Sequence, residues 1–155
     1  MFIYSVRASG LLVFAVILIA AVLVLIIATG GRSVLASSST EISFTGIKTD
    51  EDRRAFINSL GVKLKGGAVE EMTFVMPESF DRIMLGYNEI QKAQGLDLSG
   101  YAKKRITRYT YEMDGYDGYE GTVYVNLLVY RSRVIGCDIS SADPEGFVEP
   151  LIKQI

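Results

Sequence analysis

Histidine is absent from this 155-residue sequence, and its absence excludes several common kinds of catalytic centre. Ser-His-Asp and Cys-His arrangements need an imidazole to take a proton from the nucleophile. Zinc and iron sites with histidine ligands are excluded too, and so is a pH switch based on histidine titration. We therefore expect no histidine-dependent hydrolase activity and no cofactor.

Cysteine is nearly absent as well. Cys137 is the only one, so the chain cannot form an intramolecular disulfide. A folded domain of this sequence must be stabilised by its hydrophobic core alone. Cys137 lies in an apolar stretch, which favours a small buried side chain in a strand over a reactive thiol.

Acidic residues are missing from the first 40 positions. All 18 acidic residues and 14 of the 16 basic residues come later, which gives this later part a net charge of −4. Binding to nucleic acid depends on clustered Lys and Arg side chains that neutralise phosphates. The charge balance therefore predicts a domain that does not bind nucleic acid.

Between Arg7 and Arg32 the sequence has no charge at all, and Leu11–Thr29 is an unbroken apolar run. Fourteen of its 19 residues are Leu, Ile, Val or Phe. As a helix the run would be roughly 28 Å long, close to the ~30 Å thickness of a bilayer core. We predict a single transmembrane helix at residues 11–29, after a short N-terminal segment at residues 1–10.

Two other interpretations of the apolar run stay open. A cleaved signal peptide also has a basic start and an apolar core, and Val34–Ala36 would serve as its cleavage site. A buried core helix is the other, although the run has no polar face. Arg7 and Arg32 flank the two ends almost evenly. Because export signals occupy this place in a chain, we expect a cell-membrane protein whose C-terminal domain is extracytoplasmic.

Residues 30–40 are small and polar, which predicts a flexible linker, and residues 41–155 suffice for one domain. Two helices are expected in this domain. The first, Glu51–Leu60, would be capped by Thr49 and Asp50. The second, Glu78–Gln94, would follow Pro77 and bury one face consisting of Phe80, Ile83, Tyr87 and Ile90.

Alternating residues predict strands in the rest of the domain. The sequence favours an α+β fold: an antiparallel sheet made of a C-terminal three-strand meander and one or two N-terminal strands, with two helices packed on it. The meander strands are expected at Arg105–Met113, Thr122–Tyr130 and Val134–Ile139, and the N-terminal strand candidates are Ile42–Ile47, Val62–Leu64 and Val69–Met76. After Ser140 we expect a loop and a short helical turn.

Tyrosine and basic residues gather at the start of the meander. Aromatic rings with interleaved cations can bind sugars, peptides or anionic polymers by stacking and charge-assisted hydrogen bonds. Such residues also suit a half-buried sheet, and both interpretations stay open. The candidate recognition surface consists of Lys104, Arg108, Tyr109 and Tyr111.

Acidic residues gather in the next loop, where Asp114, Asp117 and Glu120 alternate with glycines. Carboxylates on such a loop are a weak candidate for a Ca²⁺ site. Their spacing does not match an EF-hand loop, and the sequence favours a long hairpin loop kept soluble by its charge. Further carboxylate pairs, Glu78 with Asp81 and Glu89 with Asp97, leave open a hydrolase that acts on glycosidic bonds.

Several stretches together resemble a bacterial domain family of unknown function, found in Gram-positive, mainly clostridial, proteins with an N-terminal membrane segment. They are Pro77–Asp81, Tyr87–Leu98, Arg108–Tyr111, Asn126–Tyr130, Val134–Gly136 and Gly146–Phe147. The resemblance covers about residues 49–147. It implies a membrane-linked protein of a Gram-positive bacterium and no particular activity.

The expected function is non-enzymatic binding, sensing or envelope assembly by a membrane-anchored extracytoplasmic domain. Its partners would be the membrane and a protein or a polymer of the cell envelope. The alternative is a carboxylate-dependent cell-wall or extracellular hydrolase.

Overall fold

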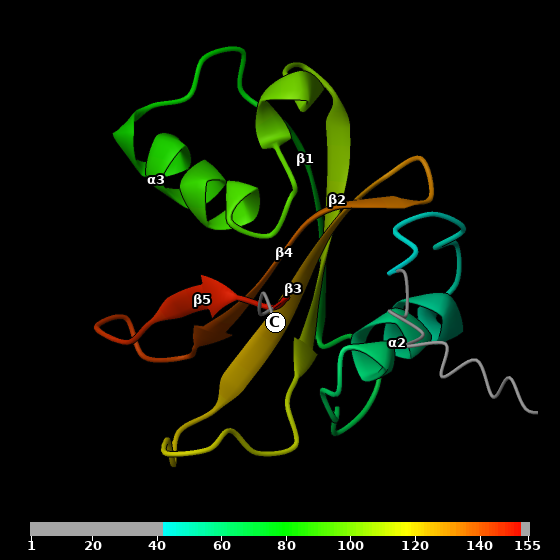
Figure 1. Cartoon of the computed structure of the whole chain (residues 1–155), viewed down its shortest axis with the longest axis vertical. Coiled ribbons are helices and arrows are strands. Elements are labelled where there is room, and N and C mark those ends of the chain that lie inside the picture. The colour runs from blue at the N-terminus through cyan, green and yellow to red at the C-terminus, as the bar shows by residue number, and fades with distance from the viewer. Residues whose placement is uncertain (1–41, 153–155) are drawn as a thin grey trace, which may run out of the picture. The chain divides into compact units, whose positions relative to one another are not determined.

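The computed structural model describes residues 42–152 (Figure 1). The predicted transmembrane helix 11–29 and the segments 1–10 and 30–40 lie outside the described residues. Within residues 42–152, none of the helices has the length and apolar character needed to cross a bilayer. The elements are α2 (Asp50–Ser59), β1 (Glu70–Val75), α3 (Arg82–Lys92), the 3-10 helix η1 (Leu98–Tyr101), β2 (Arg105–Glu112), β3 (Val123–Tyr130), β4 (Arg133–Ser141) and β5 (Val148–Pro150).

The five strands form one sheet in the order β1-β2-β3-β4-β5, and every neighbouring pair is antiparallel. The predicted α+β fold, with an antiparallel sheet and two helices, is confirmed. Strands β2, β3 and β4 are the predicted meander, and β1 corresponds to the candidate at Val69–Met76. The other two N-terminal candidates form only single bridges, Thr45 with Arg133 and Leu64 with Met113.

The prediction for the tail after Ser140 was wrong, because the chain returns to the sheet as β5. The amide N–H of Gly146 donates to the carbonyl oxygen of Asp143 at 3.0 Å and closes a turn. Strand β5 then pairs with residues 138–140 of β4. Pro150 fits there because an edge strand does not need every N–H for pairing.

A two-residue turn joins β3 to β4. Arg131 and Ser132 have φ angles of 45° and 61°, the left-handed backbone that tight hairpins require at both central residues. The turn holds Tyr130 opposite Arg133 and so sets the register of the hairpin. A β-bulge follows, where the pairing shifts between Leu128 and Val129.

Strand β3 is fully buried on the face toward α2, whereas on the other face Leu128 is buried and Tyr124, Asn126 and Tyr130 are half-buried. Its odd-numbered residues from Val123 to Val129 pack in one cluster with Phe56 and Ile57 of α2. Leu128 packs on the other face with Ile106, Ile135 and side chains of α3 and η1. The two helices therefore cover opposite faces of the sheet (Figure 1).

Helix α2 begins one residue earlier than predicted, at Asp50, because Thr49 is its N-cap. The Thr49 hydroxyl accepts from the amide of Asp52 at 3.2 Å, and the Asp52 carboxylate accepts from the amide of Thr49 at 2.8 Å. These reciprocal bonds form a capping box. The backbone amides of Thr49 and Lys48 also hold the pKa of Asp52 below its ordinary value.

Helix α3 is shorter than predicted, and only part of the predicted buried face packs on the core: Phe80 and Tyr87 do, whereas Ile83 does not. The Asp81 carboxylate accepts from the amide of Met84 at 2.8 Å, so the helix begins at Arg82 and not at Glu78. Ile83, which the apolar periodicity assigns to the core, is 80% exposed. The face turned toward the protein instead carries buried amide side chains, Asn88 and Gln91 in the helix and Gln94 after it.

These amides bind the backbone of β4 where the sheet lacks a strand. Strand β5 pairs only with residues 138–140, so the peptide groups of Cys137 have no strand partner on that side. The Oε1 atom of Gln91 accepts from the Cys137 amide at 2.8 Å, and the Nε2 atom of Gln94 donates to the Cys137 carbonyl at 2.9 Å. Gln94 Oε1 also accepts from the amide of Ile152 at 2.8 Å. Side chains thus replace the missing strand.

Replacing Gln94 by alanine should destabilise the fold much more than replacing Ile83 by alanine. Q94A leaves a buried carbonyl and a buried amide without partners, so we expect the free energy of unfolding to fall by about 2–3 kcal/mol. I83A removes an exposed side chain and should cost less than about 0.5 kcal/mol. Urea unfolding followed by tyrosine fluorescence measures both, since the sequence has no tryptophan. Equal losses would contradict the assigned role of the amide.

Candidate binding groove

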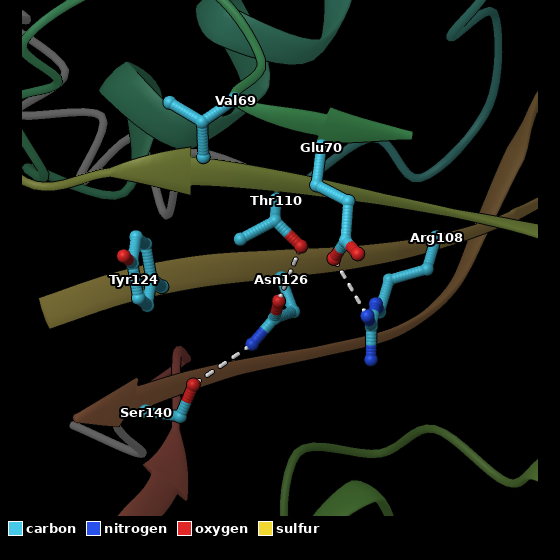
Figure 2. Close-up of a pocket in the computed structure, with 7 residues that line it drawn as sticks. All are labelled: Val69, Glu70, Arg108, Thr110, Tyr124, Asn126 and Ser140. Atoms are coloured by element: carbon cyan, nitrogen blue, oxygen red, sulfur yellow. Dashed lines mark hydrogen bonds and ion pairs between the residues drawn. The ribbon is translucent and has the colours of Figure 1, made fainter. Parts of the chain in front are cut away.

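An open groove of about 530 Å³ lies on the face of the sheet that α3 covers only in part. Its volume is within the range of small-ligand sites. Figure 2 shows the side chains that line it, which come from β1 to β4 and the residue before β1: Val69, Glu70, Arg108, Thr110, Tyr124, Asn126 and Ser140.

The strand register places four polar residues side by side across the sheet. Glu70 pairs with Thr110, Thr110 with Asn126, and Asn126 with Asp138. Directly paired residues of antiparallel strands point to the same face and touch. The result is one polar row across four strands, and the neighbouring pair Tyr124 and Ser140 lies next to it.

Asn126 is held in one orientation by its neighbours (Figure 2). Its Oδ1 atom accepts from the Thr110 hydroxyl at 2.8 Å. Its Nδ2 atom donates to the Ser140 hydroxyl at 3.0 Å and to the Asp138 carboxylate at 2.8 Å. With both ends of the amide engaged, this part of the groove is preorganised for a ligand.

Arg108 and Glu70 form an ion pair at the β1 side of the groove. The distance between Arg108 Nη2 and Glu70 Oε2 is 2.7 Å, and the two side chains are 36% and 46% exposed. Exposed ion pairs contribute little to stability because water screens them. Both charged groups therefore remain accessible for hydrogen bonds to a ligand.

Asp138 continues the polar row beneath the surface. Its carboxylate accepts from the Tyr87 hydroxyl of α3 at 2.6 Å, and only 3% of the residue is exposed. Burial raises the pKa of Asp138, and burial together with the nearby carboxylate raises the pKa of Tyr87. The positive charge of Arg108 acts in the opposite direction on both pKa values.

The spacing of the carboxylates along the row does not match that of a glycosidase. Glu70 and Asp138 are three strand spacings apart in the register, roughly 14 Å. Catalytic carboxyl groups of glycosidases lie about 5–9.5 Å apart. The carboxylate pairs considered from the sequence have other contacts: Asp81 and Asp97 cap helices, and Glu78 and Glu89 pair with lysines.

The predicted recognition surface is not assembled as one surface. Arg108 lines the groove, and Lys104 lies in the turn before β2. Tyr111 points to the opposite face, is 0% exposed and donates a hydrogen bond to Asp50. The Arg53 guanidinium lies 3.7 Å from the centre of the Tyr109 ring. Consecutive strand residues point to opposite faces, so Arg108 and the two tyrosines are separated.

The loop between β2 and β3 does not bring Asp114, Asp117 and Glu120 together. Within the described part of the chain, no group of three or more acidic or cysteine side chains is placed to hold a metal ion. The loop is instead held by aromatic packing. The rings of Tyr116 and Tyr119 have their centres 5.2 and 5.4 Å from that of Phe147.

Six of the seven groove residues escaped the sequence analysis: Val69, Glu70, Thr110, Tyr124, Asn126 and Ser140. One of them could have been recognised from the sequence. Asn126 is the only amide in the apolar strand from Val123 to Tyr130, and a buried amide needs hydrogen-bond partners. The partners themselves come from other strands and depend on the register.

Comparisons with protein-family models, curated proteins and solved structures found no match. The resemblance to a Gram-positive membrane-linked family remains a prediction.

The carboxyl group of Asp138 should make the stability of the fold depend on pH. Because its pKa is raised in the folded state, it favours folding most at pH values below about 3.9, its pKa when unfolded. This contribution is lost as the pH rises through the higher pKa of the folded state. D138N cannot ionise, so its free energy of unfolding relative to the natural protein should increase from pH 4 to pH 7. Urea unfolding at several pH values measures this difference, and a constant difference would contradict the argument.

Proposed function

We propose that this chain is a single-pass membrane protein whose residues 41–155 form a non-enzymatic binding domain outside the cell. Its groove would bind a carbohydrate polymer of the cell envelope. The apolar run at residues 11–29 supports the membrane anchor.

The observation that carries the proposal is the set of side chains in the groove. A sheet face offers a ligand almost no backbone groups, because neighbouring strands already pair them. The groove offers a carboxylate, a guanidinium and three hydroxyl groups instead, while the Asn126 amide is already bonded to its neighbours. Planar groups with two hydrogen-bonding atoms suit neighbouring hydroxyl groups of a sugar, and the Tyr124 ring can pack against the apolar face of a sugar ring.

Other ligand classes fit the groove less well. A peptide bound through its side chains needs apolar pockets, and Val69 is the only aliphatic residue in the lining. A polymer of phosphates needs unpaired cations, and Glu70 already neutralises Arg108. A hydrolase would need a second carboxylate in the groove, where Glu70 is the only one among the lining residues.

Substitutions in the groove should weaken binding to soluble oligosaccharides. Y124A removes the ring, and E70Q removes a charged acceptor; we expect each to raise the dissociation constant about tenfold. Matched controls are Y119A in the β2–β3 loop and E51Q in α2, which should bind normally. Isothermal titration with neutral, N-acetylated and anionic oligosaccharides makes the measurement.

Binding that both groove variants leave unchanged would contradict the groove as the site. Release of new reducing ends during the titration would favour the hydrolase alternative.

A further inference from the structure

The two edges of the sheet differ in how they are protected. Strand β5 has three residues, ends in Pro150 and is continued by the Gln94 amide. Strand β1 has six residues and no proline, and among residues 42–152 it pairs only with β2. All of its residues except Phe74 are exposed, including Met72 and Val75. A long unprotected edge is a template for another strand.

The backbone groups that β1 leaves unpaired follow from its register. The amide of Met76 donates to the carbonyl of Lys104 at 2.9 Å. Because bonded pairs alternate along an antiparallel ladder, every second residue of β1 bonds to β2. The N–H and C=O groups of Glu71, Thr73 and Val75 therefore point away from the sheet.

We propose that β1 pairs antiparallel with β1 of a second copy of this chain, around a two-fold axis at Thr73. In this arrangement Thr73 faces Thr73 of the second copy, and Glu71 faces Val75. All three outward residues of each strand then pair across the axis. The Thr73 hydroxyl lies 3.1 Å from that of Thr107 in β2, so the pairing extends an existing row of threonines.

Charge complementarity favours a second copy as the occupant. Strand β1 begins with Glu70 and Glu71, and it ends opposite Lys104 and Arg105 of β2. Two-fold pairing sets the acidic end of each copy beside the basic end of the other. Glu71 would lie two strand spacings, about 10 Å, from Arg105 of the second copy, which two long side chains can span.

Those charges have no ion-pair partner within the described part of one copy. Among residues 42–152, Glu71, Lys104 and Arg105 take part in no ion pair. Helix α3 packs against β4 and β5, near the opposite edge, so it leaves β1 free to pair. The two-fold arrangement therefore pairs the acidic and basic groups without moving an element of the fold.

Disulfide crosslinking of the full chain in membranes tests the pairing. In a bonded antiparallel pair the two Cα atoms lie about 5.5 Å apart, within the range of a disulfide. T73C should therefore form a disulfide-linked dimer under mild oxidation. The buried Cys137 should stay unreacted, and N58C, exposed on α2, is the control that should not crosslink.

A second pair of variants tests the register independently. E71C and V75C should each stay monomeric alone, because neither position faces itself, and should crosslink when the two chains are co-expressed. In the T73C chain, E71R should lower the dimer yield about fivefold, because it sets two like charges beside each other at both ends of the paired strands. Adding R105E should restore the yield, because the charges are then opposite again.

The proposal is overturned if T73C stays monomeric while folded, as judged by its thermal unfolding, or if N58C crosslinks equally. Failure of the mixed E71C and V75C chains to crosslink overturns the register. A crosslinked product that contains a different protein shows that another partner occupies the edge. None of these outcomes depends on whether the groove binds a carbohydrate.

Discussion

Two hydrogen bonds hold α3 against the sheet, and the groove depends on them: Gln91 accepts from the Cys137 amide, and Gln94 donates to the Cys137 carbonyl. Once α3 is in place, its Tyr87 hydroxyl reaches Asp138. Asp138 in turn accepts from Asn126, which lines the groove. A helix packed only through apolar contacts could slide along the sheet at little cost. Directional bonds to one peptide fix its position, because a buried donor or acceptor without a partner is costly.

The two faces of the sheet serve different purposes. On the α2 face, apolar side chains close the core, and even the Tyr111 hydroxyl is bonded to Asp50 and Arg53. On the α3 face, the apolar cluster ends at Leu128, and the polar row crosses β3 two residues away, at Asn126. Both faces therefore contribute a buried apolar cluster, and only the part of the α3 face beyond Leu128 presents polar groups to a ligand.

The sequence predicted what depends on local pattern. The Thr49 cap and the three strands of the meander follow from capping and alternation rules. The prediction for Ile83 in α3 was wrong, because periodicity assigns this residue to the core. Periodicity cannot reveal that amide side chains bind an unpaired peptide group at the edge of β4. The same distinction between local pattern and strand register applies to the groove. Arg108 was predicted, whereas Thr110, Tyr124 and Ser140 became neighbours only through the strand register, which no local pattern encodes.

The two-residue turn at Arg131 and Ser132 has an effect far from where it lies. Side chains alternate along a strand, so a hairpin lengthened by one residue would present the other set of β4 side chains on each face. Asp138 and Ser140 would then lose their hydrogen bonds to Asn126 and point into the apolar core beneath α2. The length of this turn therefore determines which side chains of β4 meet Asn126 in the groove at the other end of the hairpin.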